Sequence, residues 1–485
     1  MSSRIRKSLL AVAVSGLLAA PLAHATNGYF MHGYSTKNKG LAGAGAAFSQ
    51  DAMAAAVNPA GMAFVEERLD LGLQIFAPSP RGYTVTGTPP IPVGTPFAPL
   101  PGLCPDPTTV PCQTAFSVNP GSVDSENDAF LIPHFAYNHL LNDKSTIGIA
   151  VYGNGGMNTE YKSGSATLVD ANTSSPTFGT YQSFPGTYGA GTAGVNLEQM
   201  FFNFNAAYRV SQKHAVGGSL LVVGSRFRAQ GVEQFGGLSL DPTNLSGNRN
   251  SLAWGFGAKV GYQGEVADGV RVGISYQSKI SMGEFDEYKG LFAEGGDFDI
   301  PSTYTLGVSF DVGKTGVIVA DYQRINYTDT KSLSNPISKL TGGGCLDSLN
   351  ATILAGTFPT FQPASGATCL GGSDGAGFGW EDIGIFKIGY QWNAANMDWR
   401  VGYSYSDQPI PESETLFNIL APATVRQHIT AGLTKPVGSN QEFNLSLMYA
   451  PEETVKGPNP FDNGATTIEI NMSQWDIQAG WAWMF

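Results

Sequence analysis

Apolar residues alternate with polar or small residues in many segments of this chain. In residues 254–263, Trp254, Phe256, Ala258, Val260 and Tyr262 share one face, while three glycines, a lysine and a glutamine share the other. An extended strand places successive side chains on opposite faces, so this period of two predicts β-strands with one apolar face. The same alternation occurs in residues 202–209, 270–277, 386–392 and 475–485.

Three further features favour a membrane barrel over a soluble β-sandwich, which gives the same alternation. Aromatic residues lie on the apolar face near the segment ends, as in the girdles of outer-membrane barrels; they are Tyr262, Tyr276, Trp392 and Trp483. The opposite face is rich in glycine and polar residues, which suits a barrel interior. The chain ends on Phe485 after an amphipathic strand, which resembles the outer-membrane assembly signal.

The number and connection of these segments indicate a closed barrel. About fourteen segments follow residue 68, an even number, as closed bacterial barrels require. Their connections alternate between short and long, as periplasmic turns and external loops do. The short ones are residues 142–144, 211–213, 267–269, 313–314, 393–395 and 437–439, and the long ones are near residues 78–127, 156–195, 231–249, 285–301, 329–378, 407–422 and 451–465. We therefore predict an all-β fold, a 14-stranded antiparallel transmembrane β-barrel that spans residues 68–485.

Composition agrees with a membrane barrel and excludes one class of partner. Charged residues make up 14% of the chain and aromatic residues 11%, whereas soluble domains average about 25% charged residues. The mean hydropathy of −0.07 is that of a soluble protein, but only every second strand residue of a barrel faces lipid. The net charge of −12 argues against a nucleic-acid partner, which requires a basic face.

The first residues predict secretion. Arg4, Arg6 and Lys7 precede an apolar stretch, and Ala23-His24-Ala25 then has the small-x-small pattern of a signal-peptidase site. The apolar stretch is too short for a membrane anchor, which needs about 20 residues. We therefore expect residues 1–25 to be a cleaved signal peptide and the mature protein to reside in the bacterial outer membrane.

The four cysteines form two local pairs. Cys104 and Cys112 lie in one Pro-rich long loop, and Cys345 and Cys369 lie in a Gly-rich one. In a secreted chain such pairs predict disulfides that staple loops. Neither pair has CxxC spacing or a nearby histidine, and the histidines of the mature chain are scattered along the sequence. We therefore expect no metal site and no cofactor.

Residues 26–67 do not alternate and carry a different pattern. A run of small residues begins at Gly40, an alanine follows Asp51, and Asn58, Pro59 and Ala60 precede the first strand. In these residues the chain resembles the FadL/TodX family of outer-membrane transporters for long-chain fatty acids and aromatic hydrocarbons. The resemblance implies that residues 26–67 form an N-terminal hatch that plugs the barrel. Small residues allow close packing in a lumen, and Asn-Pro favours a fixed turn; a flexible linker is the alternative.

The resemblance also implies where a ligand binds and leaves. The family binds its ligand inside the barrel against the N-terminus, where this chain has Tyr29 and Phe30; packing in the wall is the alternative for both residues. A kink in the family's third strand opens the wall sideways. The corresponding residues are Gly153, Asn154, Gly155 and Gly156, which also fit a strand end.

A fatty acid requires a partner for its carboxylate. Four basic residues lie on the inferred inward faces, namely Arg209, Lys259, Arg271 and Lys387. A buried cation gains most from an anionic partner, so these residues are candidates for the head-group site. Pairing with inward acids is the alternative, and an uncharged hydrocarbon needs none of them.

These observations predict passive transport of hydrophobic compounds, with long-chain fatty acids as the favoured substrate. We expect a monomer that contacts outer-membrane lipid and lipopolysaccharide, and a ligand that shifts the hatch and leaves through the wall. A general porin and a surface receptor are the alternatives. An enzyme would need a nucleophile beside a base, and the sequence contains no such motif.

Overall fold

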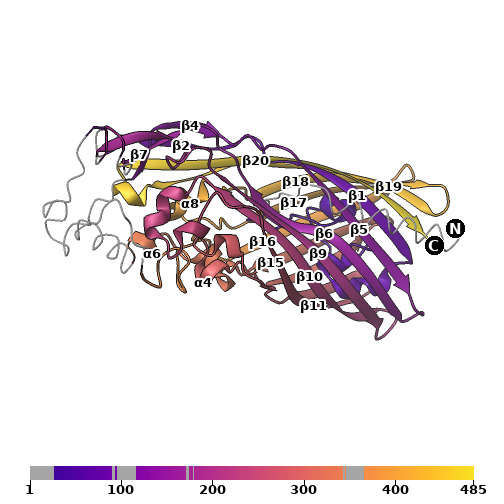
Figure 1. Ribbon diagram of the computed structural model, residues 1–485. Helices are drawn as coiled ribbons and strands as arrows, with labels where there is room; N and C mark the ends of the chain where they lie inside the picture. The colour runs from indigo at the N-terminus through magenta and orange to yellow at the C-terminus, as the bar shows by residue number, and fades with distance from the viewer. Residues whose placement is uncertain are drawn as a thin grey trace.

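Fourteen antiparallel strands close into a barrel in the computed structural model, as predicted. The structure describes residues 27–89, 93–94, 116–170, 174–178, 180–341, 345 and 365–485. The barrel closes where β1 pairs with β20 on one side and with β5 on the other (Figure 1). In order around the wall, the strands are β1 (Arg68–Ala77), β5 (Phe130–Leu140), β6 (Ser145–Asn158), β9 (Gly194–Arg209), β10 (His214–Gln230), β11 (Ser251–Ala267), β12 (Val270–Gln277), β14 (Thr303–Val312), β15 (Gly316–Ile325), β16 (Ile383–Ala394), β17 (Met397–Ser406), β18 (Gln427–Val437), β19 (Gln441–Pro458) and β20 (Thr466–Met484).

The two faces of the wall differ as the alternation predicts. Phe256 and Phe386 project outward and are 61% and 64% exposed, as a lipid-facing side chain is in the absence of a bilayer. Lys259, Gln277 and Ser404 project inward and are buried. The barrel therefore has an apolar exterior and a polar, glycine-rich interior.

The long loops gather at one end of the barrel and contain short elements (Figure 1). The strands are β2 (Arg81–Gly87), β3 (Ser117–Val118), β4 (Gly121–Asp124), β7 (Ser165–Val169), β8 (Tyr181–Pro185) and β13 (Ser281–Met282). The helices are η2 (Glu233–Leu238), η3 (Pro242–Asn244), η4 (Asp286–Tyr288), α4 (Ala293–Gly296), η5 (Tyr327–Asp329), α5 (Lys331–Ser334), α6 (Ser338–Thr341), η6 (Glu412–Glu414), α8 (Thr415–Asn418) and η7 (Pro460–Asp462). Within the described ranges, no helix has the length and apolarity needed to cross a membrane.

The strands next to these loops are longer than the sequence analysis expects. The predicted loop 451–465 is partly strand, because β19 continues to Pro458 and pairs there with β20. Residues 78–127, the long loop that follows β1, contain β2. This strand pairs with the extended part of β20. Continued ladder pairing satisfies the backbone groups of these segments, so the sheet extends beyond the wall.

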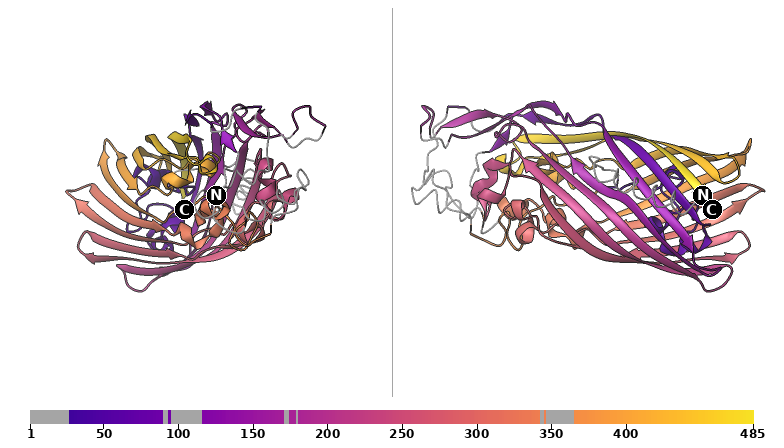
Figure 2. Two further views of the ribbon diagram at one scale, coloured as in Figure 1. Left: turned by 90° about the vertical axis from the view of Figure 1, so that its left-hand side faces the viewer. Right: turned by 45° about the vertical axis from the view of Figure 1, so that its right-hand side comes forward.

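Residues 27–67, which we call the N-terminal domain, lie against the inner face of the wall. They contain α2 (Thr36–Gly40), α3 (Ala54–Val57) and η1 (Pro59–Phe64). Helix α2 contacts β17 to β20, and η1 contacts β6, β9, β10 and β11. Figure 2 shows this indigo segment enclosed by the strands. We call residues 27–32 the tip of the domain and residues 35–67 its base.

Candidate transport site

An apolar pocket lies among the long loops. Its cavity volume is about 40 Å³, and on the same measure one water molecule needs about 10–15 Å³. Its lining includes Phe227, Phe235, Phe292, Phe378, Phe417 and Leu420. A hydrophobic molecule larger than this space enters only when these side chains move apart.

Aromatic side chains continue from this pocket into the barrel. Phe292 lies 4.8 Å from Phe298, measured between ring centroids, and Phe298 lies 6.2 Å from Tyr29. A second series leads from Phe378 to Trp380 and from Trp380 to Tyr29, with 6.1 Å at each step. Both series end on Tyr29, which is fully buried. The pocket and the tip thus belong to one apolar core.

The backbone of the tip is bound to β6. The contacts are a hydrogen bond from Gly156 N–H to the Tyr29 carbonyl oxygen (3.1 Å), one from Met31 N–H to the Asn154 carbonyl oxygen, and a β-bridge between Phe30 and Gly155. A Cβ on Gly155 would lie 1.6 Å from the Tyr29 carbonyl oxygen. Only glycine therefore permits this close approach of the two backbones.

Strand β6 is irregular at the same place. Its register against β9 shifts between Gly153 and Gly155. Its pairing with β5 runs from Leu140 to Phe135, which lies opposite Val151. Among the described residues, no ladder pair joins residues 130–134 of β5 to β6. The wall is therefore interrupted between β5 and β6, beside the tip.

Met31 packs against the part of β5 that β6 leaves unpaired. It is 6% exposed and forms an apolar cluster with Phe130 and Ile132, against which Tyr34 also packs. The Tyr34 hydroxyl donates to Asn154 Oδ1 at 3.0 Å, which connects the segment between tip and base to β6. The sequence analysis did not single out Met31 or Tyr34, although both lie close to Tyr29 and Phe30 in sequence.

Asn58 begins η1 and connects the base to the wall. Its Nδ2 donates to the carbonyl oxygens of Ala46 and Tyr262, both at 2.8 Å, and its Oδ1 accepts the Ala60 N–H at 3.1 Å. Pro59 follows at the first helical position, where the missing N–H costs nothing. The Asn-Pro-Ala motif thus fixes the start of η1 and its position against β11.

Glycines in the wall receive this motif. Gly217 and Gly261 lie opposite each other in β10 and β11. A Cβ on Gly261 would lie 2.0 Å from Asn58 Oδ1, and one on Gly217 would lie 2.5 Å from the Ala60 nitrogen. Part of the glycine-rich inner face is therefore explained by close contact with the N-terminal domain.

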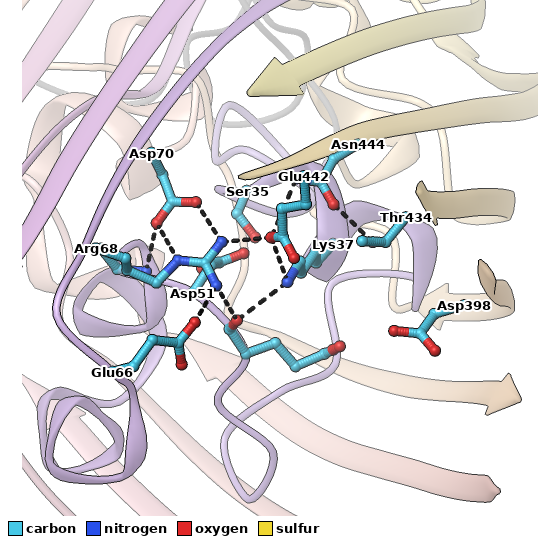
Figure 3. Close-up of polar contacts among 12 residues, drawn as sticks. Ser35, Lys37, Asp51, Glu66, Arg68, Asp70, Asp398, Thr434, Glu442 and Asn444 are labelled. Atoms are coloured by element: carbon cyan, nitrogen blue, oxygen red, sulfur yellow. Dashed lines mark hydrogen bonds and ion pairs between the residues drawn. The ribbon is translucent and has the colours of Figure 1, made fainter. Parts of the chain in front are cut away.

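Buried ion pairs hold the base at its junction with β1 and β19 (Figure 3). Arg68 donates to both oxygens of Asp70, at 2.9 and 2.7 Å, and to Glu66 at 2.7 Å. Glu442 of β19 accepts from Arg68 and from Lys37 of α2, the latter at 2.6 Å. Such a network stabilises one arrangement because removing one partner leaves buried charges unpaired.

Gly40 and Asp51 also lie in the base. A Cβ on Gly40 would lie 3.2 Å from the Gly432 Cα, so α2 packs closely on β18. Asp51 Oδ1 accepts the Met53 N–H at 3.1 Å, and Asp70 accepts the Ala52 N–H at 2.9 Å. Burial, with the Asp70 carboxylate nearby, raises the pKa of Asp51 to about 6.

Comparison with known proteins decides the family. The family model "Outer membrane protein transport protein (OMPP1/FadL/TodX)" matches residues 16–177 and 173–456. The chain belongs to this family. It is accordingly an outer-membrane β-barrel, and the resemblance seen in the sequence is confirmed. No curated protein sequence matches the chain.

Solved structures agree on the fold of this family member. The Pseudomonas putida toluene transporter TodX is 16% identical, with a TM-score of 0.60 over 94% of this chain and 99% of that one. A Pseudomonas aeruginosa FadL homologue is 14% identical, with a TM-score of 0.60 over 94% and 100%. The Ralstonia pickettii toluene transporter TbuX is 17% identical, with a TM-score of 0.53 over 94% and 99%.

The four basic candidates of this OMPP1/FadL/TodX protein fall into two groups. Lys259 donates to the Ala56 carbonyl oxygen and lies 6.0 Å from the Tyr34 ring centroid. Lys387 donates to Gln323 Oε1 at 2.8 Å and to the His32 carbonyl oxygen at 3.5 Å. Both lysines are buried beside the N-terminal domain; Lys387 contacts its tip at His32, whereas Lys259 contacts its base at Ala56.

The two arginines lie next to short turns instead. Arg209 Nε donates to the Ala63 carbonyl oxygen at 2.6 Å, and its guanidinium lies over the Phe64 ring. Arg271 forms a bidentate pair with Asp311 at 2.9 Å. The structure therefore does not bring the arginines together with Tyr29 and the two lysines.

The described residues include one of the two cysteine pairs. Cys345 and Cys369 form a disulfide, with their Cα atoms 5.0 Å apart, which confirms that prediction. Cys104 and Cys112 lie outside the described residues, as do residues 1–26 with the predicted signal peptide.

Proposed function

We propose that this outer-membrane protein transports hydrophobic molecules passively, with residues 26–67 as its hatch and long-chain fatty acids as its main substrates. One observation carries the proposal. The apolar core is continuous from the loop pocket to Tyr29 and Phe30, and it ends where the β5–β6 ladder is interrupted. A hydrophobic ligand following this core avoids water at every step, which the hydrophobic effect favours.

In this proposal the tip is the moving part of the hatch. Ligand that enters the core displaces Tyr29 and Phe30 from their aromatic neighbours. A ligand shifts such an equilibrium only by binding the displaced state more tightly than the seated one. No energy source is required, so net uptake follows the concentration gradient.

The proposed exit lies between β5 and β6. Movement of the tip withdraws Met31 from Phe130 and Ile132, which uncovers the interrupted part of the ladder. Leaving sideways takes the ligand into lipid, whereas the periplasm would expose its apolar surface to water at about 25 cal/mol per Å².

Lys259 is the proposed partner of a fatty acid carboxylate. It is buried beside Tyr34, and Tyr34 is bonded to Asn154 at the irregular part of β6. A buried ammonium group gains more from a carboxylate than from the Ala56 carbonyl oxygen that it contacts now. An aromatic hydrocarbon would use the same path without this contact.

Uptake by cells tests the function. Cells that carry or lack the protein are given a labelled long-chain fatty acid and, in parallel, labelled toluene. We expect uptake of the fatty acid to fall when the protein is absent. The variant Lys259→Met should lower fatty acid uptake without changing toluene uptake, whereas Lys213→Met, at an exposed turn, should change neither.

Other outcomes would favour different functions. Loss of toluene uptake alone would make aromatic hydrocarbons the substrate class. No change for either compound, together with steady ion conductance in planar bilayers, would favour the porin alternative. No change and no conductance would favour a surface receptor.

A further inference from the structure

Two histidines from distant parts of the chain meet where the tip joins the base. The ring centroids of His32, at the end of the tip, and His428, in β18, are 4.4 Å apart. The hydroxyl of Ser404 in β17 lies 3.2 Å from His32 Nε2 and 3.1 Å from His428 Nδ1. A hydroxyl has one proton, so it can donate to one ring while it accepts from the other. The tip is thereby bonded to the wall through neutral imidazoles.

The other nitrogen of each ring has no hydrogen-bond partner among the described residues. These nitrogens, His32 Nδ1 and His428 Nε2, are both buried. A protonated imidazole carries two N–H donors and a positive charge. Adding a proton to either ring would therefore place an uncompensated charge in a buried site, which is costly.

The surrounding charges increase this cost. The groups on the elements around the pair are Lys387 of β16, which donates to the His32 carbonyl oxygen, Lys39 of α2, which pairs with Asp476 of β20, and Asp321 of β15, which accepts the Gly45 and Ala46 N–H groups at 2.8 and 3.0 Å. Two cations thus lie close to the pair, and both acids already accept other donors. Burial is the largest cause that holds the pKa of His32 well below its usual value, and the nearby His428, Lys387 and Lys39 lower it further.

We propose that His32, Ser404 and His428 form a proton-sensitive latch that keeps the tip seated at neutral pH and releases it in acid. The latch extends the proposed function, because it acts on the part of the hatch that moves. The proton then regulates a transport step that itself requires no energy source.

The direction of the pH effect follows from linkage. A released tip exposes both rings to water, where an imidazole has a pKa of about 6.5. The seated tip requires both rings to be neutral, so protons bind preferentially to the released state. Below a pH of about 6.5, release becomes about tenfold more favourable per pH unit for each histidine. At higher pH the equilibrium does not depend on pH.

Hydrogen exchange of the intact protein in detergent tests the latch without any ligand. The Met31 amide, which donates to the Asn154 carbonyl oxygen, reports whether the tip is seated. After correction for intrinsic exchange, we expect its protection to fall at least about tenfold between a pH of about 7.5 and one of about 5. In the double variant His32→Gln, His428→Gln the protection should be the same at both pH values.

His214→Gln is the matched control. His214 begins β10 next to a short turn, and its ring is hydrogen-bonded to the Tyr262 hydroxyl of β11. The variant should keep the full pH dependence of the wild type. Equal protection of Met31 in the wild type at both pH values would overturn the latch, as would loss of the pH dependence in His214→Gln.

A parallel uptake measurement separates this inference from the proposed function. The probe is an uncharged aromatic hydrocarbon, because the ionisation of a fatty acid changes over the same pH range. Faster uptake in acid by the wild type, absent in the double variant His32→Gln, His428→Gln, supports the latch. Uptake without any pH dependence overturns the latch and leaves transport intact. No uptake of this hydrocarbon or of a long-chain fatty acid at any pH, with Met31 still responding to pH, overturns the proposed function and leaves the latch intact.

Discussion

The tip and the base of the N-terminal domain are held by different forces, although both are buried in the same barrel. Ion pairs and side-chain hydrogen bonds fix the base to the wall, as Arg68 does with Asp70 and Glu442. The tip has aromatic contacts, the backbone bonds to β6 and the histidine contact.

The contrast bears on the motion that we propose for the tip. Breaking the contacts of the base leaves buried charges without partners, which costs several kcal/mol. The apolar contacts of the tip can be replaced by contacts with a hydrophobic ligand, because such contacts are not directional. Under the proposed function, we therefore expect a ligand to displace the tip while the base stays in place.

The strongest way to break the contrast is to remove Arg68. Arg68→Met leaves Asp70 buried without its cation and Glu442 with Lys37 alone, and we expect a loss of about 3–5 kcal/mol in the free energy of unfolding. Thermal unfolding of the purified barrel in detergent measures the loss. Lys162→Met, which removes an exposed pair with Glu126, should cost at most about 1 kcal/mol. Equal effects of the two variants would mean that the base is not held by its charges.

A methyl group at Gly155 should release the tip and leave the base seated. In Gly155→Ala the new Cβ would clash with the Tyr29 carbonyl oxygen. We expect the hydrogen-exchange protection of Met31 to fall by at least about tenfold, since the lost contacts are worth about 1.4 kcal/mol or more. The variant Gly218→Ala is the control, because its Cβ would meet only the Lys259 carbonyl oxygen at 3.8 Å. Unchanged protection of Met31 in Gly155→Ala would show that the tip is not seated on β6.

The same substitution in the two regions sharpens the comparison. Met31 in the tip and Met53 in the base are 6% and 1% exposed. Each change to alanine removes buried contacts that are worth about 2–5 kcal/mol in a rigid core. Met31→Ala should speed the uptake of a hydrophobic compound, because the tip is displaced more easily. Met53→Ala should lower the thermal stability and leave uptake by the folded protein unchanged; the reverse pattern would place the moving part in the base.

The barrel could be predicted from the sequence because its signal is local. Alternation in residues 254–263 specifies a strand without reference to any other part of the chain, and the short turns specify which strands are neighbours. The glycines at 153–156 likewise marked the place where β6 shifts its register. The family motif at Asn58 and Pro59 predicted that the N-terminal domain carries function.

The contacts within the site could not be predicted, because they join residues far apart in sequence. His32 meets His428, and Arg68 meets Glu442, only after the barrel closes and the domain is seated. Alternation placed Arg271 on the inner face, but its height along the strand decides that it pairs with Asp311 near a turn. A face is specified by a period of two, whereas a partner is specified by the register of several strands.

The last prediction concerns the acid pair of the base, Asp51 and Asp70. Burial beside Asp70 raises the pKa of Asp51 to about 6, against about 3.9 in an unfolded chain. The folded state therefore binds more protons between these values, and stability decreases as the pH rises through this window, by at most about 1.4 kcal/mol per pH unit. Asp51→Asn should remove this part of the pH dependence, measured as the melting temperature from a pH of about 4 to one of about 7. An unchanged profile would mean that Asp51 is ionised throughout, with Lys37 and Arg68 as sufficient partners. All the acids around Arg68 and Lys37 would then be ionised, and the contrast of the base with the tip would be sharper still.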